Sequence, residues 1–254
     1  MFFHFESPRF LLTRGRNKEL AESLIKIALI NGKTLPDDFE ITNPKELDDE
    51  KHVEPKIADI FRGEYFRQSI LLCLVWFFHV FAYYGLLVWL PKFTESKKIT
   101  NLNISLHFLF VGLAELPGLL FTVLAIERIG RKWTLFINFC GAAITTFVFA
   151  FSESQVTVLI FSGCIYFFVV GIWAILYIFT PELYPTTHRA AAFGMVGLFA
   201  KVGGVIVSPI IGAMWKVAVP PFWILFTCFV CFIFAGLATL GIRKETKQKV
   251  LLDF

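Results

Sequence analysis

The stretch VTVLIFSGCIYFFVVGIWAILYIF, residues 156–179, decides the fold of this chain. It contains no charged side chain, and at an α-helical rise of about 1.5 Å per residue it is long enough to cross the ~30 Å hydrocarbon core of a bilayer. In lipid, each backbone N–H and C=O must be paired within the segment, so a single apolar run of this length is predicted to be a helix. A β-barrel strand would be much shorter and would alternate polar with apolar residues, which this stretch does not.

Five further apolar runs flank this stretch, at residues 69–90, 106–126, 133–151, 190–215 and 222–241. The chain has 254 residues, of which 56% are hydrophobic and 17% are charged, whereas about 25% charged residues is typical of soluble domains. Composition and run length together exclude a soluble enzyme, a nucleic-acid-binding module and a disordered chain. The sequence therefore predicts an all-α membrane protein with six transmembrane helices.

The polar segments divide the chain into three predicted parts. Residues 1–68 form a connector, residues 69–241 a transmembrane lobe, and residues 242–254 a tail. Within the connector, residues 18–30 carry apolar side chains at helical spacing, and Asn31-Gly32 suits a helix end. This amphipathic helix lies on the membrane surface, forms a partner site or packs under the bundle as a connector, and the pattern favours the last interpretation.

The distribution of Lys and Arg sets the predicted orientation. Counted over the polar segments in alternation, 19 of the 24 Lys and Arg lie on one side of the membrane and 4 on the other, and Lys201 is the one inside a predicted helix. Cytoplasmic segments are the richer in Lys and Arg, so both termini are predicted to be cytoplasmic. The protein is accordingly predicted to be a multi-pass integral protein of the plasma membrane or of an intracellular vesicle membrane.

Three ionisable side chains fall deep inside predicted helices. By helical rise, His79 lies roughly 15 Å, Glu115 roughly 14 Å and Lys201 roughly 17 Å from the start of its helix. A Lys or a carboxylate facing lipid at this depth costs at least ~2.5 kcal/mol. The three groups are therefore predicted to face an internal cavity, where Glu115 and Lys201 either pair with each other or hold a charged solute.

Aromatic side chains share the faces of these groups. Trp76, His79 and Tyr83 follow each other at helical spacing, and the quoted stretch carries Tyr166 and Trp173 on one face. Aromatic walls with few fixed charges suit an amphipathic or aromatic ligand. The alternative interpretation is a structural ion pair with aromatic packing between helices. The predicted substrate-binding residues are His79, Tyr83, Glu115, Tyr166, Trp173 and Lys201.

Two charged clusters lie on the predicted cytoplasmic side. The first is the short turn E-R-I-G-R-K at residues 127–132, in which Gly130 permits a tight backbone. The second is P-E-L-Y-P-T-T-H-R at residues 181–189, whose Glu182 and Arg189 can pair with the first cluster. These charges form either a gate that closes the cytoplasmic side or a static cap.

These two motifs resemble the major facilitator superfamily. Residues 6–11, E-S-P-R-F-L, followed by Gly15-Arg16, resemble the start of the central cytoplasmic loop of its sugar and organic-ion transporters. The phrases F-A-Y-Y-G-L at residues 81–86 and A-E-L-P-G at residues 114–118 are most similar to the branch of synaptic vesicle glycoprotein 2 and its related proteins. The organic cation and anion transporters are next in similarity.

The resemblance implies one lobe, the C-terminal half, of a twelve-helix major facilitator fold. It implies that an N-terminal six-helix lobe is the partner and that the two lobes move a small organic solute, an organic ion in these branches, by alternating access, with a proton or cation as an optional coupling partner. The positions that match the family's gating motifs are Glu127, Arg128, Gly130, Arg131, Glu182 and Arg189.

The rival prediction is a transport-inactive scaffold or vesicle-trafficking protein that keeps the transporter fold. An enzyme is not expected, because the sequence has no His-x-x-x-His pair, serine nucleophile motif or paired carboxylates at the membrane plane. Neither a cofactor, a metal site nor a nucleic-acid partner is predicted.

Overall fold

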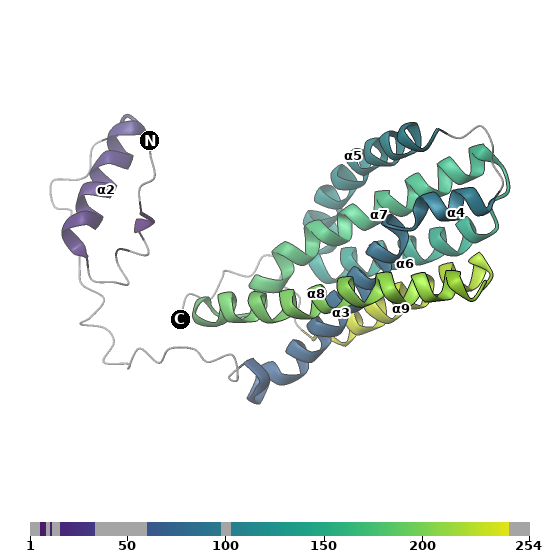
Figure 1. The fold of residues 1–254 in the computed structure, drawn as a ribbon. Coiled ribbons are helices and arrows are strands. Elements are labelled where there is room, and N and C mark those ends of the chain that lie inside the picture. Colours follow the sequence, from purple (N-terminus) through teal and green to yellow (C-terminus); the bar gives the residue numbers. More distant parts are fainter. Residues whose placement is uncertain (1–5, 9–10, 12–15, 34–59, 98–102, 244–254) are drawn as a thin grey trace. The chain divides into compact units, whose positions relative to one another are not determined.

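The computed structural model describes residues 6–8, 11, 16–33, 60–97 and 103–243, except for the side chains of residues 64, 186 and 187 (Figure 1). The chain divides into two compact units, Met1–Glu54 and Pro55–Phe254, and each unit is held by contacts of its own.

The first unit contains the helix predicted in the connector. Helix α2 spans Asn17–Ile30 and ends at Asn31, followed by Gly32 with a φ of +64°. Arg16 holds the start of this helix, because its guanidinium pairs with the carboxylates of both Glu6 and Glu19. The predicted helix is confirmed, whereas its placement on a membrane surface or under the bundle stays a prediction.

The second unit is built from helices. A short 3₁₀ turn, η3 (Gly63–Tyr65), leads into α3 (Phe66–Leu87). The remaining helices are α4 (Leu90–Ser96), α5 (Ile104–Ile129), α6 (Arg131–Ala150), α7 (Gln155–Glu182), α8 (Thr186–Lys216) and α9 (Pro221–Gly241). The described residues include no β-strand, and six of these helices are long and apolar enough to cross a membrane. The prediction of six spanning helices is confirmed.

Two details of these helices differ from the sequence prediction. Five of the six helices extend two or more residues beyond their apolar runs at one end or both, as α7 does at Thr180–Glu182, because backbone hydrogen bonding continues past the last apolar side chain. The short helix α4 was not predicted. It has only seven residues, with Pro91 in its first turn, and it lies where the apolar run ends. It is therefore too short for a periodic pattern to indicate it.

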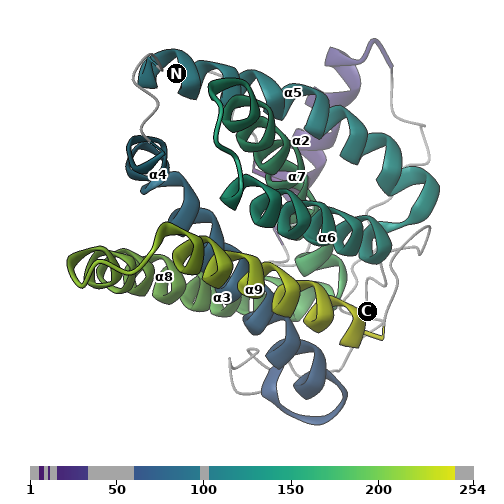
Figure 2. The ribbon, with the colours of Figure 1, turned by 90° about the vertical axis from the view of Figure 1, so that its right-hand side faces the viewer.

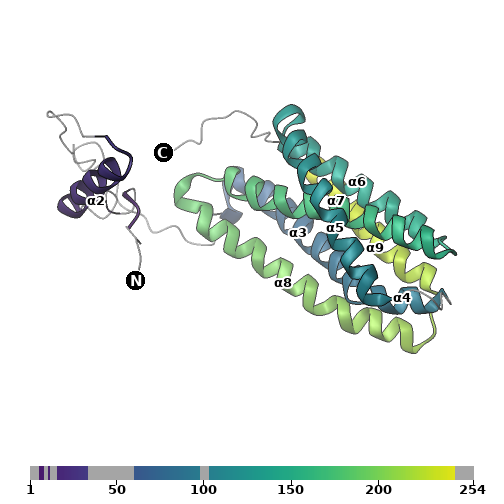
Figure 3. The same ribbon diagram turned by 90° about the horizontal axis from the view of Figure 1, so that it is seen from above.

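The six long helices pack as two groups of three. Helix α3 packs on α8 and α9, helix α7 packs on α5 and α6, and contact between α6 and α9 joins the groups. Figure 2 shows α3, α8 and α9 on one side of the bundle and α5, α6 and α7 on the other. Helix α4 lies beside the C-terminal end of α8, where the rings of Phe93 and Trp215 are 5.6 Å apart (Figure 3).

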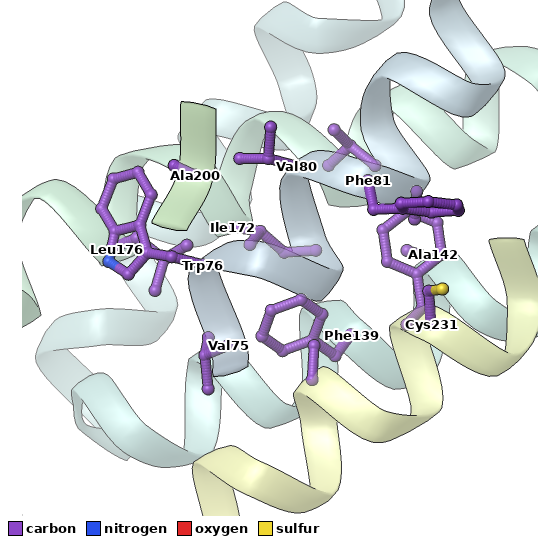
Figure 4. Packing of buried hydrophobic residues seen from close by; sticks show 14 of the residues in the cluster. Val75, Trp76, Val80, Phe81, Phe139, Ala142, Ile172, Leu176, Ala200 and Cys231 are labelled. Carbon is purple, nitrogen blue, oxygen red and sulfur yellow. The ribbon is translucent and has the colours of Figure 1, made fainter. Parts of the chain in front are cut away.

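The core between the two groups is aromatic and aliphatic. Figure 4 shows Trp76 of α3 beside Leu176 of α7 and Ala200 of α8, all of them buried. The indole Nε1 of Trp76 donates a hydrogen bond to Thr180 Oγ1 at 3.0 Å, which links α3 to α7 inside the core. Since lipid tails are as apolar as the core, close packing and such interhelical hydrogen bonds hold the helices together.

One glycine fixes the distance between α5 and α7. A Cβ added to Gly118 would lie 2.2 Å from the backbone carbonyl oxygen of Phe167. The two helices therefore approach each other more closely at this point than any side chain allows. The small residues of α8 make looser contacts, because Gly204 and Gly212 face the rings of Tyr84 and Trp89.

The helix ends at the α3–α5 and α6–α7 connections are held by polar side chains. The side-chain oxygen of Asn103 accepts from the backbone N–H groups of Ser105 and Leu106 and caps α5. Lys97 Nζ donates to the carbonyl oxygen of Ala150 at 3.1 Å and to that of Ser152 at 2.7 Å, which caps the end of α6. Burial lowers the pKa of Lys97, and the nearby carboxylate of Glu153 opposes that shift.

We expect Gly118→Ala to destabilise the protein by about 2 kcal/mol, because the new methyl group overpacks against a backbone atom that has little room to move. Gly112→Ala is the matched control on the same helix, since nothing lies within 4 Å of its Cβ position. The measurement is the melting temperature of the purified protein in detergent. Equal melting temperatures for the two variants would contradict the close contact.

Candidate functional site

Aromatic side chains line a groove between α3, α5 and α7. The groove has a volume of about 390 Å³. This α3–α5–α7 groove is lined by Tyr83, Tyr84, Glu115, Val169, Val170, Trp173 and Tyr177. Glu115 is half-buried near the middle of α5 and is the only charged residue among the lining residues that the structure describes.

Trp173 is the centre of this groove. Its ring lies 5.4 Å from the ring of Tyr83, nearly at a right angle, and 5.9 Å from that of Tyr177, at an interplanar angle of 24°. On the other side, Trp76 meets Trp173 edge-on at 5.8 Å. Ring pairs in these arrangements stabilise each other by about 0.5–1.5 kcal/mol, so the neighbouring rings help to hold the aromatic wall in this arrangement.

His79 lies behind the groove rather than along it. Its side chain is fully buried, and the imidazole contacts Trp173 at 4.8 Å between ring centroids, with Phe139 and Phe232 on its other sides. Neither ring nitrogen has a hydrogen-bond partner among the described residues. His79 therefore packs against Trp173 on the side away from the groove. Direct contact of His79 with a ligand stays a prediction.

Tyr166 occupies a similar second layer. Its ring is 2% exposed and lies 6.4 Å from the ring of Tyr83, and its hydroxyl has no hydrogen-bond partner among the described residues. Of the six predicted substrate residues, Tyr83, Glu115 and Trp173 line the groove together, whereas Tyr166 and His79 back it.

Lys201 lies outside the groove, on an exposed part of α8. It is one or two turns from two residues of α8 that touch the groove's aromatic wall. The ring of Phe193 is 5.7 Å from that of Tyr177, and Gly204 faces Tyr84. In the described part of the chain, Glu115 and Lys201 do not form an ion pair, so the pairing considered from the sequence is not found.

Tyr84 is a lining residue that the sequence pattern did not identify. Adjacent residues on a helix point about 100° apart, so Tyr84 does not share the helical face that joins Trp76, His79 and Tyr83. The wide rings of Tyr83 and Tyr84 nevertheless meet at 5.0 Å and both reach the groove. The sequence feature that could have identified Tyr84 is the Tyr-Tyr pair in an otherwise apolar run.

The charged end of the bundle comprises residues 127–132 and 181–189. Gly130 is the single residue between α5 and α6, with φ 101° and ψ 170°, a conformation that only glycine adopts readily. Arg131 begins α6, and its guanidinium lies 3.3 Å from the Glu182 carboxylate at the end of α7. The structure thus joins the two motifs through an ion pair that is largely shielded from solvent.

The other predicted gating residues take different places at this end. Arg189 donates from Nε to the backbone carbonyl of Tyr184 at 3.1 Å. Glu127 and Arg128 are exposed on the last turn of α5. Whether any of the six residues gates transport stays a prediction.

Tyr184 is the anchor of the charged end, and sequence reasoning did not single it out. Ser69 Oγ donates to the carbonyl of Ile60 at 2.6 Å, so the Tyr184 hydroxyl, 2.8 Å away, donates to Ser69 Oγ. Burial raises the pKa of Tyr184 to about 12, which keeps this donor protonated. The residue therefore ties the start of α3 to the corner between α7 and α8.

A comparison with known families identifies this arrangement. Residues 1–253 match the family described as Sugar (and other) transporter. The chain belongs to that family. It is a branch of the major facilitator superfamily, so the resemblance seen in the motifs is confirmed. With its six spanning helices, this member of the family is a multi-pass integral membrane protein.

Three relatives show the range of the family. The niacin transporter NiaP of Acinetobacter baylyi is 32% identical over 98% of this chain and 55% of its own length. The synaptic vesicle 2-related protein of Rattus norvegicus is 28% identical over 98% of this chain and 47% of its own length. Human solute carrier family 22 member 13 is 30% identical over 83% and 38%. The chain thus spans about half the length of the curated relatives it matches.

We expect His79→Phe to raise the stability of the protein by about 1 kcal/mol, or a melting temperature ~2–4 °C higher, because it removes two unpartnered polar atoms from an aromatic site. His107→Phe is the control, since that buried imidazole is bonded to Ser162 Oγ at 2.7 Å and the variant should be less stable. The measurement is thermal unfolding in detergent. A lower melting temperature for His79→Phe would show that the imidazole has a stabilising partner.

Proposed function

We propose that the chain is the C-terminal lobe of a secondary-active transporter that moves small organic solutes by alternating access. The observation that supports this most directly is the α3–α5–α7 groove, an aromatic recess with one carboxylate at mid-depth in a six-helix bundle. Such a recess binds a flat solute through its ring faces and orients it through a few polar groups. No covalent step is needed, and the relatives that carry a functional name are named as transporters.

The partner in this proposal is an N-terminal six-helix lobe, with the lipid bilayer around both. Helices α5 and α8 are the least buried of the six spans. Gly112 of α5 and Gly194 and Gly197 of α8 have nothing within 4 Å of their Cβ positions. Small residues on an outward face allow another helix to approach closely. These positions therefore suit contact between a second lobe and the exposed faces of α5 and α8. The length of the relatives agrees with a partner of similar size.

The solute that we propose is an aromatic organic ion. The Acinetobacter relative is named for niacin, a pyridine ring with a carboxylate. A ring of that size fits against Trp173 and Tyr83, with Glu115 beside it in the groove and Lys201 on the neighbouring helix. His79 and Tyr166 then act through the rings that they support. A coupled proton or cation belongs to this proposal as an option.

The domain division, the orientation and the gating roles are also part of the proposal. Residues 1–68 serve as the connector to the first lobe and residues 242–254 as a tail, both on the cytoplasmic side, as the Lys and Arg distribution favours. The membrane is the plasma membrane or that of an intracellular vesicle. The gate at the charged end comprises Glu127, Arg128, Gly130, Arg131, Glu182 and Arg189.

The test is solute exchange by the natural protein, expressed from its own gene and reconstituted in liposomes. We expect counterflow of radiolabelled niacin or nicotinamide, and a loss of about tenfold in Trp173→Ala, because the ring loses its stacking surface. Trp223→Ala is the matched control, since that indole is 54% exposed at the start of α9. A protein that reaches membranes but exchanges neither compound would refute transport of this class and favour the scaffold alternative.

We expect Arg131→Gln and Glu182→Gln each to slow turnover several-fold while leaving solute affinity unchanged, because the pair holds the charged end and lies away from the groove. The charge-swapped double variant should recover part of the rate. Counterflow rates and equilibrium binding, measured on the same preparations, separate the two effects. Lost affinity with an unchanged rate would assign the pair to the binding site instead.

A further inference from the structure

The α3–α5–α7 groove has an uneven balance of charge. Its lining contains four aromatic rings and two valines, and among the described lining residues its one carboxylate is that of Glu115. In the described part of the chain, no Lys, Arg or His nitrogen lies within ion-pair distance of the Glu115 carboxylate. A half-buried carboxylate without a counter-charge at this depth is costly unless a cation joins it.

The positively charged candidates on the neighbouring helices do not change this balance. Lys201 lies on α8 and does not line the groove. His79 is separated from the groove by the rings of Trp173 and Tyr83, which it contacts on their inner side. As far as the described residues go, the groove therefore presents negative charge and no fixed positive charge to a solute.

The ring geometry adds to the same preference. Trp173 and Tyr177 lie nearly parallel and form one wall, while Tyr83 stands almost perpendicular to Trp173. The face of an aromatic ring is electron-rich, so rings around a recess attract a cation, and the indole does so most strongly. Three aromatic rings and one carboxylate are the chemistry that recognises ammonium and pyridinium groups.

We propose that this groove selects organic cations, in particular an aromatic ring that carries a permanent positive charge, over organic anions of the same size. The cation lies against Trp173 and Tyr177 with its charge toward Glu115. The inference rests on the proposed transport function and specifies its substrate class. It gives Glu115 the role of the residue that decides charge preference.

Three pyridine compounds of matched size test this preference. Niacin is an anion at neutral pH, nicotinamide is neutral, and 1-methylnicotinamide is a permanent cation. Each compound is added as an inhibitor of labelled nicotinamide counterflow in liposomes that contain the natural protein, and the concentration that halves the counterflow is measured. We expect the cation to inhibit at a concentration about tenfold lower than the anion. Equal or stronger inhibition by the anion would overturn the proposal.

Substitutions at Glu115 locate the cause. In Glu115→Gln we expect the ratio of the inhibitory concentration of the anion to that of the cation to fall to about one. Glu115→Asp, which keeps the charge, should retain the cation preference. The matched control is Glu153→Gln, because that carboxylate is exposed in the loop between α6 and α7. An unchanged ratio in Glu115→Gln, or equal losses in both Glu115 variants, would contradict the assignment.

A binding measurement separates this proposal from the transport function. The shift in melting temperature caused by each compound needs no transport, so it reports on binding alone, and Glu115→Gln assigns that binding to the groove. A larger shift with the cation than with the anion, lost in Glu115→Gln, supports the charge preference even if the protein shows no counterflow. The absence of counterflow would refute only the transport function. Counterflow that favours niacin would support transport and overturn the charge preference.

Discussion

The requirement that every backbone polar group be paired inside a hydrocarbon medium governs this structure. In lipid an unpaired N–H or C=O costs several kcal/mol, so each apolar run has to become a helix, whatever its local propensities. Once the helices are fixed, apolar area does not choose their partners, because lipid tails solvate leucine as well as another helix does. Which helices pack against each other is decided by shape complementarity and by a few interhelical hydrogen bonds. Gly118 against the Phe167 backbone and Trp76 to Thr180 are the two that this lobe shows most clearly.

Because the medium imposes the helices, the sequence was sufficient to predict them. Six apolar runs gave six spanning helices, and the amphipathic pattern at residues 18–30 gave α2. The helix that escaped prediction, α4, is the one that the bilayer does not impose. It lies at the end of an apolar run and is held by tertiary contacts, such as Phe93 on Trp215, that no local pattern encodes.

The site was predictable only to the level of the helical face. Spacing put Trp173 on one helical face, and Val170 and Tyr177, which lie on the same face by the helical period, line the groove with it. It gave no means to tell a side chain that lines a recess from one that lies behind it, and so His79 and Trp173 looked alike. It also gave depth without direction. Glu115 and Lys201 lie at similar depths, yet α5 turns its carboxylate into the groove while α8 leaves the ammonium outside.

The joint at Gly130 has a mechanical consequence. Helix α5 ends at Ile129 and helix α6 begins at Arg131, so one residue in a conformation reserved for glycine carries the whole change of direction. Because the connection is a single residue long and Arg131 pairs with Glu182, we expect a tilt of α5 to move the first turn of α6 and, through the ion pair, the end of α7. Helices α5, α6 and α7 are therefore connected at the charged end, and two of them, α5 and α7, also line the groove.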